Sequence, residues 1–300
     1  MAFNWPVFKT RAQTALIFVA VMAAGLLTSH WLFLLLFSVI HWGCWIEYQS
    51  IMSKIHPEYK EIGPFHRYGV ILAGLGLLLF ATADFWKIGN VSISAFGFWI
   101  ALIMAFVLPV TELLFSRHIN LKNIWTSLKG LVYISLSLAL MIHIRSGDIW
   151  RMADKENLFF QINVSSAAYT GFLIPLIIIG SIWINDTMAY LVGSFIGKTP
   201  LSKISPRKTW EGTVGGIILS VAIISLVGYL SHASWLHYLA ISLIASVAGT
   251  FGDLYESKLK RMANVKDSGS FMPGHGGFLD RFDSLLFAVP FVWLYAVAFM

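Results

Sequence analysis

Nine long apolar windows, separated by short polar segments, run through this 300-residue chain. Most are close to the roughly 20 residues that a helix needs to cross a bilayer. Because 57% of the residues are hydrophobic and only 12% are charged, lipid must be the solvent for much of the surface. The pattern predicts an all-α, polytopic integral membrane protein with about nine transmembrane helices. The windows are 13–30, 31–46, 68–86, 93–115, 125–144, 171–195, 212–230, 236–256 and 285–299.

The windows divide into two regions according to the polar segments between them. Residues 1–170 hold about five spans, the first two joined by a tight hairpin at Ser29-His30. Residues 171–300 hold the other spans together with the loops richest in acids, bases and glycines. We therefore expect an N-terminal membrane region and a C-terminal catalytic membrane region.

The basic residues indicate how the chain is oriented. With the N-terminus in the cytoplasm, 17 of the 21 Lys and Arg residues fall in cytoplasmic segments, as the positive-inside rule requires. This orientation predicts a multi-pass protein of the cytoplasmic (inner) membrane with its motif-bearing loops facing the cytoplasm. The net charge of +6 does not indicate nucleic-acid binding, because the basic residues are spread along membrane borders.

The first cluster of polar residues lies at the end of the eighth window. Asp253, Glu256, Ser257 and Lys260 are spaced to share one face of a helix. A helix end whose charges simply reach water is an alternative for any one of them. Asp253 favours a functional site, since ionisable groups at such depth usually line a polar cavity.

A glycine-rich segment, residues 274–283, precedes the last window. Its glycines allow close backbone approach or anion binding, and Asp280 and Asp283 would share a face of the following helix. Carboxylates suit Mg²⁺, which completes its coordination with water and phosphate oxygens. For Asp283, an acid at a dipole-positive helix start is an equal alternative. For His275, a structural turn residue is favoured over direct catalysis.

A third polar segment lies between the sixth and seventh windows. Asp186 interrupts a hydrophobic helix, which indicates an internal polar site. The loop 205–209 offers two cations, hydroxyl groups and a following helix N-terminus, all favourable for a triphosphate; a positive-inside anchor is the alternative. Among the other acids, Glu47 and Glu58 are expected in a solvated cytoplasmic loop. Glu112 is left open between a cavity and the interface.

Residues 257–283 resemble the C-terminal signature of the phosphatidate cytidylyltransferases, also called CDP-diacylglycerol synthases. The segments Asn-Asp-Thr-x-Ala-Tyr, from residue 185, and Ser-Pro-x-Lys-Thr-x-Glu-Gly, from residue 205, extend the resemblance to about 185–284. Asn185 stands where many members of that family carry Ser. The first half of the chain is similar only in having several membrane helices. The matching signature positions are Ser257, Leu259, Lys260-Arg261, Lys266-Asp267, Gly269, Pro273, His275-Gly276-Gly277, Asp280-Arg281 and Asp283.

The resemblance implies that CTP and phosphatidic acid react to give CDP-diacylglycerol and pyrophosphate. It implies Mg²⁺ bound by Asp253 and Asp280, with Asp283 as the supporting acid, and a second cation such as K⁺. It also suggests a homodimer. Catalysis is assigned to Asp253, Asp280, Asp283, Lys260 and Arg261. Substrate binding is assigned to Asp186, Ser205, Lys208, Thr209, Glu211, Lys266, Asp267 and Arg281.

Four other functions remain open at this point. The chain could cytidylylate another lipid phosphate, or use CTP to phosphorylate an isoprenoid alcohol. A secondary transporter would explain acids within broken membrane helices, but the polar groups cluster at one membrane face and no paired repeat is evident. A non-catalytic lipid-binding relative would not need to retain every matching acid.

Overall fold

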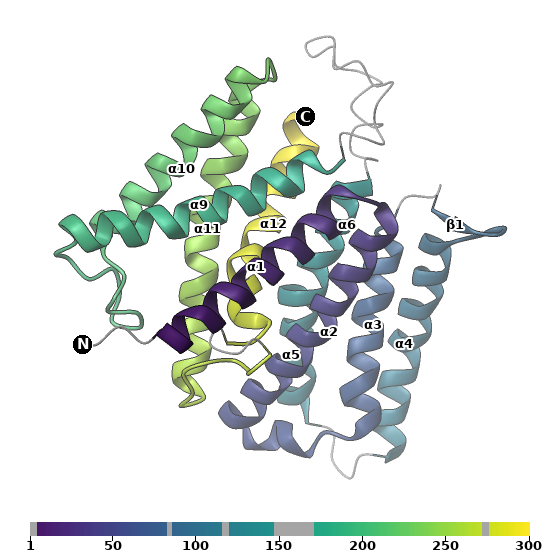
Figure 1. Ribbon diagram of the computed structural model, residues 1–300. Coiled ribbons are helices and arrows are strands. Elements are labelled where there is room, and N and C mark those ends of the chain that lie inside the picture. The colour runs from purple at the N-terminus through teal and green to yellow at the C-terminus, as the bar shows by residue number, and fades with distance from the viewer. Residues whose placement is uncertain (1–4, 83–85, 116–119, 147–170, 272–275) are drawn as a thin grey trace. The chain divides into compact units, whose positions relative to one another are not determined.

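The structure, a computed structural model, describes residues 5–82, 86–115, 120–146, 171–271 and 276–300 (Figure 1). Among these residues, helices dominate and the only sheet is a two-stranded antiparallel ribbon. The fold-class prediction is therefore confirmed. The described chain forms two compact units: residues 1–142 with 259–282, and residues 143–258 with 283–300. Helices α11 and α12 each contribute to both units.

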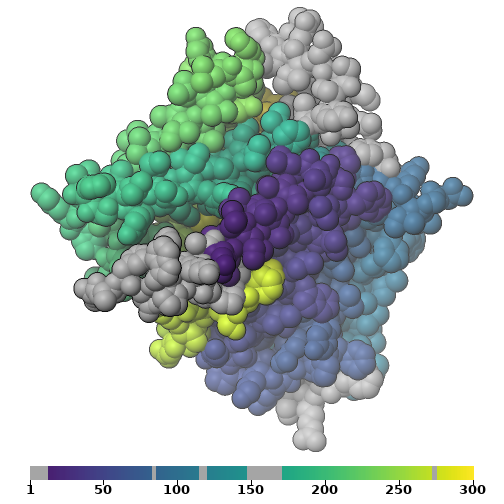
Figure 2. Space-filling model, viewed as in Figure 1, coloured from purple at the N-terminus to yellow at the C-terminus, as the bar shows by residue number. Residues whose placement is uncertain are grey.

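The first unit contains the N-terminal helices and the turn between α11 and α12. In the space-filling view, α1 lies on the visible surface in purple (Figure 2), and its Leu16 and Ile17 are exposed, as expected of a lipid-facing helix. Its elements are α1 (Trp5–Leu27), α2 (His30–Ile55), the 3₁₀ helix η1 (Pro57–Glu61), α3 (Pro64–Phe80), β1 (Lys87–Ile88), β2 (Val91–Ser92), α4 (Ile93–Phe115), α5 (Leu121–Gly130), the π-helix η2 (Leu131–Leu136) and most of α6 (Ser137–Ser146).

Polar residues at the window edges explain where these helices begin. Ser29 caps α2 by accepting a hydrogen bond from the Leu32 amide at 3.2 Å, and Asn120 caps α5 through the Lys122 amide at 3.0 Å. Pro64 starts α3, where a missing N–H costs nothing. Inside the unit, the Trp45 indole and the His41 ring each hydrogen-bond to the Ser135 hydroxyl at 2.9 Å. The indole N–H of Trp45 and one ring nitrogen of His41 thereby find partners inside the protein, where lipid offers none.

The second unit contains residues 143–146 at the end of α6, four further helices and the loop between the first two of these. Helices α9 and α10 lie together (Figure 1), and Gly212 brings their backbones into contact: a Cβ there would lie 2.6 Å from the Ala189 carbonyl oxygen. Small residues at such crossings are typical of membrane helices. The elements are α9 (Leu173–Ile196), α10 (Trp210–Leu230), α11 (Trp235–Met262) up to residue 258, and α12 (Leu279–Phe299) from residue 283.

Seven of the described helices are long and apolar enough to cross a membrane, and two shorter apolar helices, Gln13–Leu27 and Pro64–Phe80, accompany them. Each of the nine apolar windows coincides with one of these nine segments, but the count of nine spans stays a prediction. Two helices extend well beyond their apolar windows. Helix α2 continues to Ile55, and α11 continues through Ser257 to Met262, so part of the charged C-terminal run is helical.

Candidate active site

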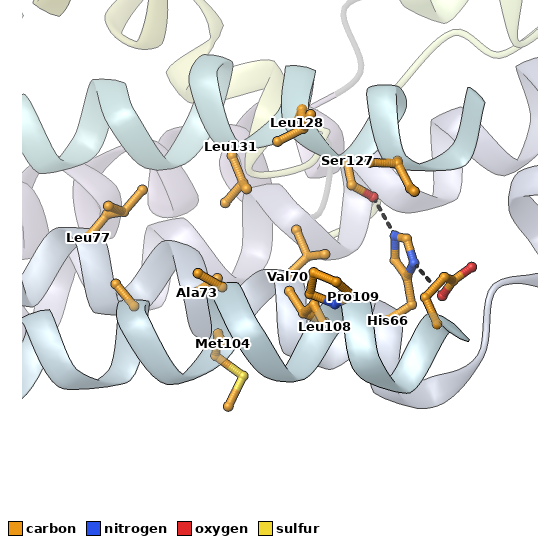
Figure 3. Close-up of a pocket in the computed structure, with 14 residues that line it drawn as sticks. His66, Val70, Ala73, Leu77, Met104, Leu108, Pro109, Ser127, Leu128 and Leu131 are labelled. Carbon is orange, nitrogen blue, oxygen red and sulfur yellow. Dashed lines mark hydrogen bonds and ion pairs between the residues drawn. The ribbon is translucent and has the colours of Figure 1, made fainter. Parts of the chain in front are cut away.

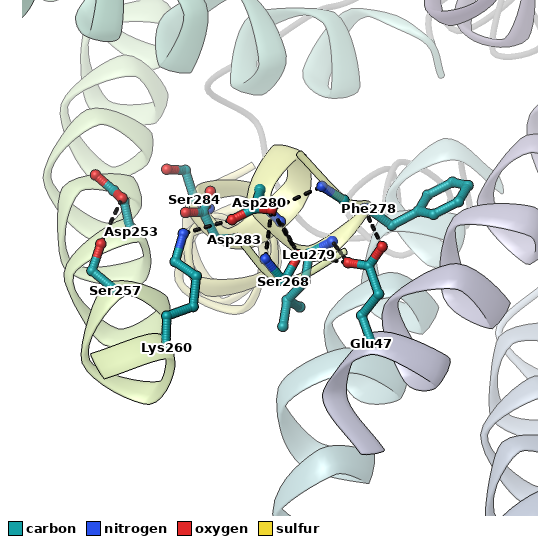
Figure 4. Close-up of polar contacts among 11 residues, drawn as sticks. Glu47, Asp253, Ser257, Lys260, Ser268, Phe278, Leu279, Asp280, Asp283 and Ser284 are labelled. Atoms are coloured by element: carbon teal, nitrogen blue, oxygen red, sulfur yellow. Dashed lines mark hydrogen bonds and ion pairs between the residues drawn. The ribbon is translucent and has the colours of Figure 1, made fainter. Parts of the chain in front are cut away.

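Three carboxylates gather in the second unit, and we call Asp253, Glu256 and Asp283 the carboxylate cluster. One oxygen from each lies within 4.8 Å of the others. Glu256 is fully buried and Asp283 is 7% exposed. Asp253 comes from α11 and Asp283 from α12 (Figure 4). Glu256 lies about one turn after Asp253 on α11. Like charges this close repel strongly, so the cluster is suited to a cation.

A close helix crossing brings these acids together. Gly252, next to Asp253, leaves room for α12: a Cβ at this position would lie 2.5 Å from the Asp283 carbonyl oxygen and 2.7 Å from Cβ of Phe287. A larger residue would therefore push the two helices apart. The helix period then places Glu256 on the same face of α11 as Asp253. Gly252 thus belongs to the site, because it allows the close helix approach that brings Asp253 and Asp283 together.

Lys208 forms an ion pair with Asp253 at the cluster. The same carboxylate accepts a hydrogen bond from the Ser257 hydroxyl at 3.4 Å. Lys208 belongs to the loop between α9 and α10, and its own backbone helps to close that loop: the Leu201 amide donates to the Lys208 carbonyl at 2.7 Å. A lysine ammonium is thereby held against the acids, where it can offer a phosphate three N–H donors.

Two other predicted substrate-binding residues hold this loop in shape. The Thr209 hydroxyl caps α10 by accepting from the Gly212 amide at 3.2 Å. The Glu211 carboxylate accepts from the amides of Lys198 and Thr199, each at 3.2 Å. These contacts position Lys208. Ser205 contributes its carbonyl oxygen, which accepts from the Lys208 amide at 3.1 Å.

A second polar group, in the first unit, surrounds Asp280 at the start of α12 (Figure 4). Lys260 donates to its Oδ1 at 2.5 Å, and the amides of Ser268 and Gly277 each donate to Oδ2 at 2.8 Å. Gly276 has a φ of +83°, a left-handed conformation that glycine adopts without strain. A Cβ there would also lie 2.5 Å from the Asp280 carboxylate. The glycine-rich segment therefore wraps closely around Asp280.

The remaining predicted residues lie around these two groups. Lys260 stands on the last turn of α11, which ends at Met262. Just after the helix, Asn264 has a φ of 55° and the Val265 amide donates to the Lys260 carbonyl at 2.9 Å. His275 lies outside the described residues. The predicted residues with exposed side chains are Asp186 in the second unit and Arg261, Lys266, Asp267 and Arg281 in the first.

Two acids, Glu47 and Glu256, have surroundings that the sequence did not predict. Glu47 was expected in a solvated loop, but α2 extends past its apolar window and Glu47 is buried, 8% exposed. It contacts the start of α12. Glu256 shares a helix face with Asp253, as its spacing predicts, but the sequence alone assigned it no metal role. What indicates a metal role for Glu256 is its complete burial beside two other acids, which the sequence alone does not show.

The carboxylate cluster could hold a divalent cation, and its spacing can be compared with that of a magnesium site. In an octahedral shell with bonds of about 2.1 Å, ligand oxygens on opposite sides are about 4 Å apart. The oxygens of Asp253, Glu256 and Asp283 lie within 4.8 Å of one another, so small side-chain movements would complete such a site. Asp280 lies one helical turn before Asp283 on α12. Its metal role stays a prediction, because both of its oxygens already accept hydrogen bonds from N–H donors.

An apolar pocket of about 410 Å³ lies elsewhere in the first unit, among α3, α4, α5 and the first residue of η2 (Figure 3). Its polar end is His66, which contacts Glu112 at 3.1 Å and the Ser127 hydroxyl at 2.8 Å. Glu112 therefore lines this cavity and pairs with His66. Of the two alternatives for Glu112, a cavity or the membrane interface, the structure supports the cavity. Apart from this end, the lining is almost entirely apolar.

The fold and the polar groups define a class: a helical, multi-pass membrane protein with acids and lysines gathered at helix ends. The chain belongs to the Cytidylyltransferase family, whose model matches residues 9–299. It is 46% identical over 121 residues to a phosphatidate cytidylyltransferase of Bacillus subtilis, which covers 39% of this chain and 45% of that protein.

Two further relatives extend this similarity. The phosphatidate cytidylyltransferase of Synechocystis is 36% identical over 189 residues, covering 59% of this chain and 64% of that protein. That of Staphylococcus saprophyticus is 50% identical over 114 residues, covering 36% and 43%. The matched segments thus span from under half to just under two thirds of these relatives' lengths.

Proposed function

We propose that this chain is a phosphatidate cytidylyltransferase, which converts CTP and phosphatidic acid into CDP-diacylglycerol and pyrophosphate. The observation that carries the proposal is the carboxylate cluster with Lys208 paired to it. Membership of the Cytidylyltransferase family and the printed names of the relatives support the choice of nucleotide and lipid. The membrane-length helices suit an enzyme whose acceptor is a lipid.

The proposed chemistry is a direct in-line transfer. An unprotonated oxygen of the phosphatidate phosphate forms a bond to the α-phosphorus of CTP. The bond from that phosphorus to the oxygen bridging the α- and β-phosphates breaks, and pyrophosphate leaves with the electron pair. Phosphate monoesters are largely ionised at neutral pH, so the attacking oxygen needs no strong protein base. The protein must instead align two anions that repel each other.

The chain's own residues supply this alignment. We propose that Lys208 exchanges its ion pair with Asp253 for a CTP phosphate oxygen when the nucleotide binds, which frees the carboxylate for the metal. Mg²⁺ held by Asp253, Glu256 and Asp283 would neutralise charge on the reacting phosphates. Further phosphate contacts are proposed for the basic residues Lys260, Arg261 and Lys266.

Several finer points also remain proposals. The positive-inside count supports a multi-pass protein of the cytoplasmic membrane with its active site facing the cytoplasm. A second cation such as K⁺ and a homodimer are proposed from the family resemblance alone. The lipid bilayer, CTP and phosphatidic acid are the proposed partners, and no nucleic acid is expected to bind.

The test is a pyrophosphate-release assay on the purified protein in lipid–detergent micelles, with each nucleoside triphosphate and a panel of lipid phosphates and isoprenoid alcohols. We expect equal amounts of pyrophosphate and CDP-diacylglycerol from CTP and phosphatidic acid. Asp253→Asn should lower turnover by about 100-fold or more, whereas Glu58→Gln, at an exposed acid in η1, should not. A preference for another acceptor, or a phosphorylated alcohol as product, would overturn the proposal.

A further inference from the structure

Glu47 is a buried acid that the proposed chemistry does not use. It lies on α2, and its carboxylate accepts three hydrogen bonds (Figure 4). The Phe278 amide donates to Oε1 at 2.9 Å and the Leu279 amide to Oε2 at 2.8 Å. The Ser268 hydroxyl donates to Oε2 at 2.6 Å. One side chain from a distant helix therefore contacts both Ser268 and the two residues that directly precede Asp280.

These bonds satisfy the beginning of α12. The first turn of a helix has amide groups without partners inside the helix, and the helix dipole favours a negative charge there. Phe278 and Leu279 are the residues at which α12 begins. Their amides donate to an ionised acceptor, and charge-assisted hydrogen bonds of this kind are about twice as strong as neutral ones. Glu47 thus acts as an N-cap supplied by another helix.

The fit around Glu47 is close on every side. A Cβ on Gly269 or on Gly277 would overlap the Glu47 carboxylate. One turn earlier on α2, a Cβ on Gly43 would overlap the ring of Phe278. Three glycines therefore give the start of α12 and its preceding loop direct access to α2. A larger residue at any of these positions would have to displace the Glu47 carboxylate or the Phe278 ring.

Ser268 links Glu47 to Asp280. Its hydroxyl lies 2.6 Å from Glu47 Oε2 and 2.8 Å from Asp280 Oδ2. A hydroxyl has one hydrogen to donate, so the two carboxylates share a single donor. The Ser268 amide also donates to Asp280 at 2.8 Å. Moving Glu47 would therefore disturb both the position and the hydrogen bonding of Asp280.

We infer that Glu47 is a positioning residue for the proposed cytidylyl transfer. It fixes the start of α12 and thereby the placement of Asp280. This inference rests on the proposed function, because its effect is measured on turnover. Glu47 touches neither substrate nor metal in this account, so it acts through other residues.

The test compares Glu47→Gln with Glu47→Asp and with Glu58→Gln. The amide of Glu47→Gln turns one acceptor into a donor that faces a hydroxyl or an amide hydrogen. We expect kcat to fall about 10- to 100-fold, as small misplacements of catalytic groups do, with KM for CTP within about threefold of wild type. Glu47→Asp should recover part of the loss, because it keeps the charge. Glu58→Gln alters an exposed acid and should behave as wild type.

Three outcomes decide the inference. Wild-type kcat in Glu47→Gln would overturn it, as would a loss confined to KM or no recovery in Glu47→Asp. If Glu47→Gln does not fold, Ser268→Ala carries the test, because it breaks the link to Asp280 and keeps the backbone bond. A several-fold fall in its kcat is expected, and an unchanged kcat overturns the inference. If the wild-type protein forms no CDP-diacylglycerol, the proposed function fails instead.

Gly277→Ala gives an independent check on the contact itself. In the wild-type background the new methyl group must displace Glu47, so the kcat loss should match that of Glu47→Gln. In a Glu47→Ala background the methyl group meets no carboxylate, so the same change should cost at most about twofold more. Equal losses in both backgrounds would show that Gly277 acts without Glu47 and would contradict the inference.

Discussion

Glu256→Gln should separate stability from activity at the carboxylate cluster. Two like charges 4.8 Å apart repel by about 3.5 kcal/mol at an effective dielectric constant of 20. Glu256 faces two such neighbours, and its fully buried position keeps water from screening them. Lys208 offsets part of this repulsion at Asp253, and protonation of one acid would offset more. Without metal, the free energy of unfolding of Glu256→Gln is therefore expected to exceed that of the wild type by about 1–3 kcal/mol.

The assay is thermal unfolding of the purified protein by scanning fluorimetry, with EDTA and with excess Mg²⁺. In EDTA, Glu256→Gln should unfold several degrees above wild type, since 1 kcal/mol corresponds to about 2–4 °C for proteins of 150–250 residues and somewhat less for longer chains. Excess Mg²⁺ should raise the wild-type Tm, because a ligand at 100 times its Kd stabilises by about 2.7 kcal/mol, and should raise the variant less. Turnover of the variant should fall. This reasoning is refuted if Mg²⁺ leaves the wild-type Tm unchanged and Glu256→Gln unfolds at a lower temperature than wild type in EDTA.

Three further predictions follow from the contacts of single residues. Lys208→Ala should raise KM for CTP about tenfold or more, because a phosphate loses its ammonium partner; an unchanged CTP dependence in initial-rate assays would exclude that role. Asp280→Asn should lower kcat about 100-fold even at saturating Mg²⁺, since it breaks the pair with Lys260; near wild-type turnover would remove Asp280 from the site. Gly212→Val should separate α9 from α10 and lower Tm by several degrees, whereas Val214→Ala, at an exposed position on α10, should leave Tm unchanged.

Much of the fold follows from the sequence because lipid imposes a simple rule. A backbone without water must satisfy its own hydrogen bonds, so each apolar window becomes a helix. Window edges are less informative, because a helix continues wherever its neighbours hold it. Helix α2 continues nine residues past its window, to Ile55, and this extension makes Glu47 a buried residue rather than a loop residue.

The site is predictable only in part. Asp253 and Asp283, which the family resemblance assigns to one metal site, do come together, because glycine at 252 lets the two helices touch. The roles of Glu256 and Glu47 depend on burial and on partners far away in the sequence. Glu47 and Leu279 are 232 residues apart, and no local pattern encodes such a contact. Spacing identifies which acids share a helix face, but not which acids of two helices meet.

The central claim is that Asp253, Glu256 and Asp283 bind one divalent cation that the reaction needs. Manganese titration of the purified protein, followed by electron paramagnetic resonance, tests it most directly, with Mn²⁺ as the probe. We predict one saturable site per chain, lost in Asp283→Asn and retained in Glu58→Gln, with CDP-diacylglycerol formation rising over the same range of Mn²⁺ concentration. Equal Mn²⁺ binding by wild type and Asp283→Asn would contradict the claim. So would enzymatic activity that does not change with the fraction of sites occupied by Mn²⁺.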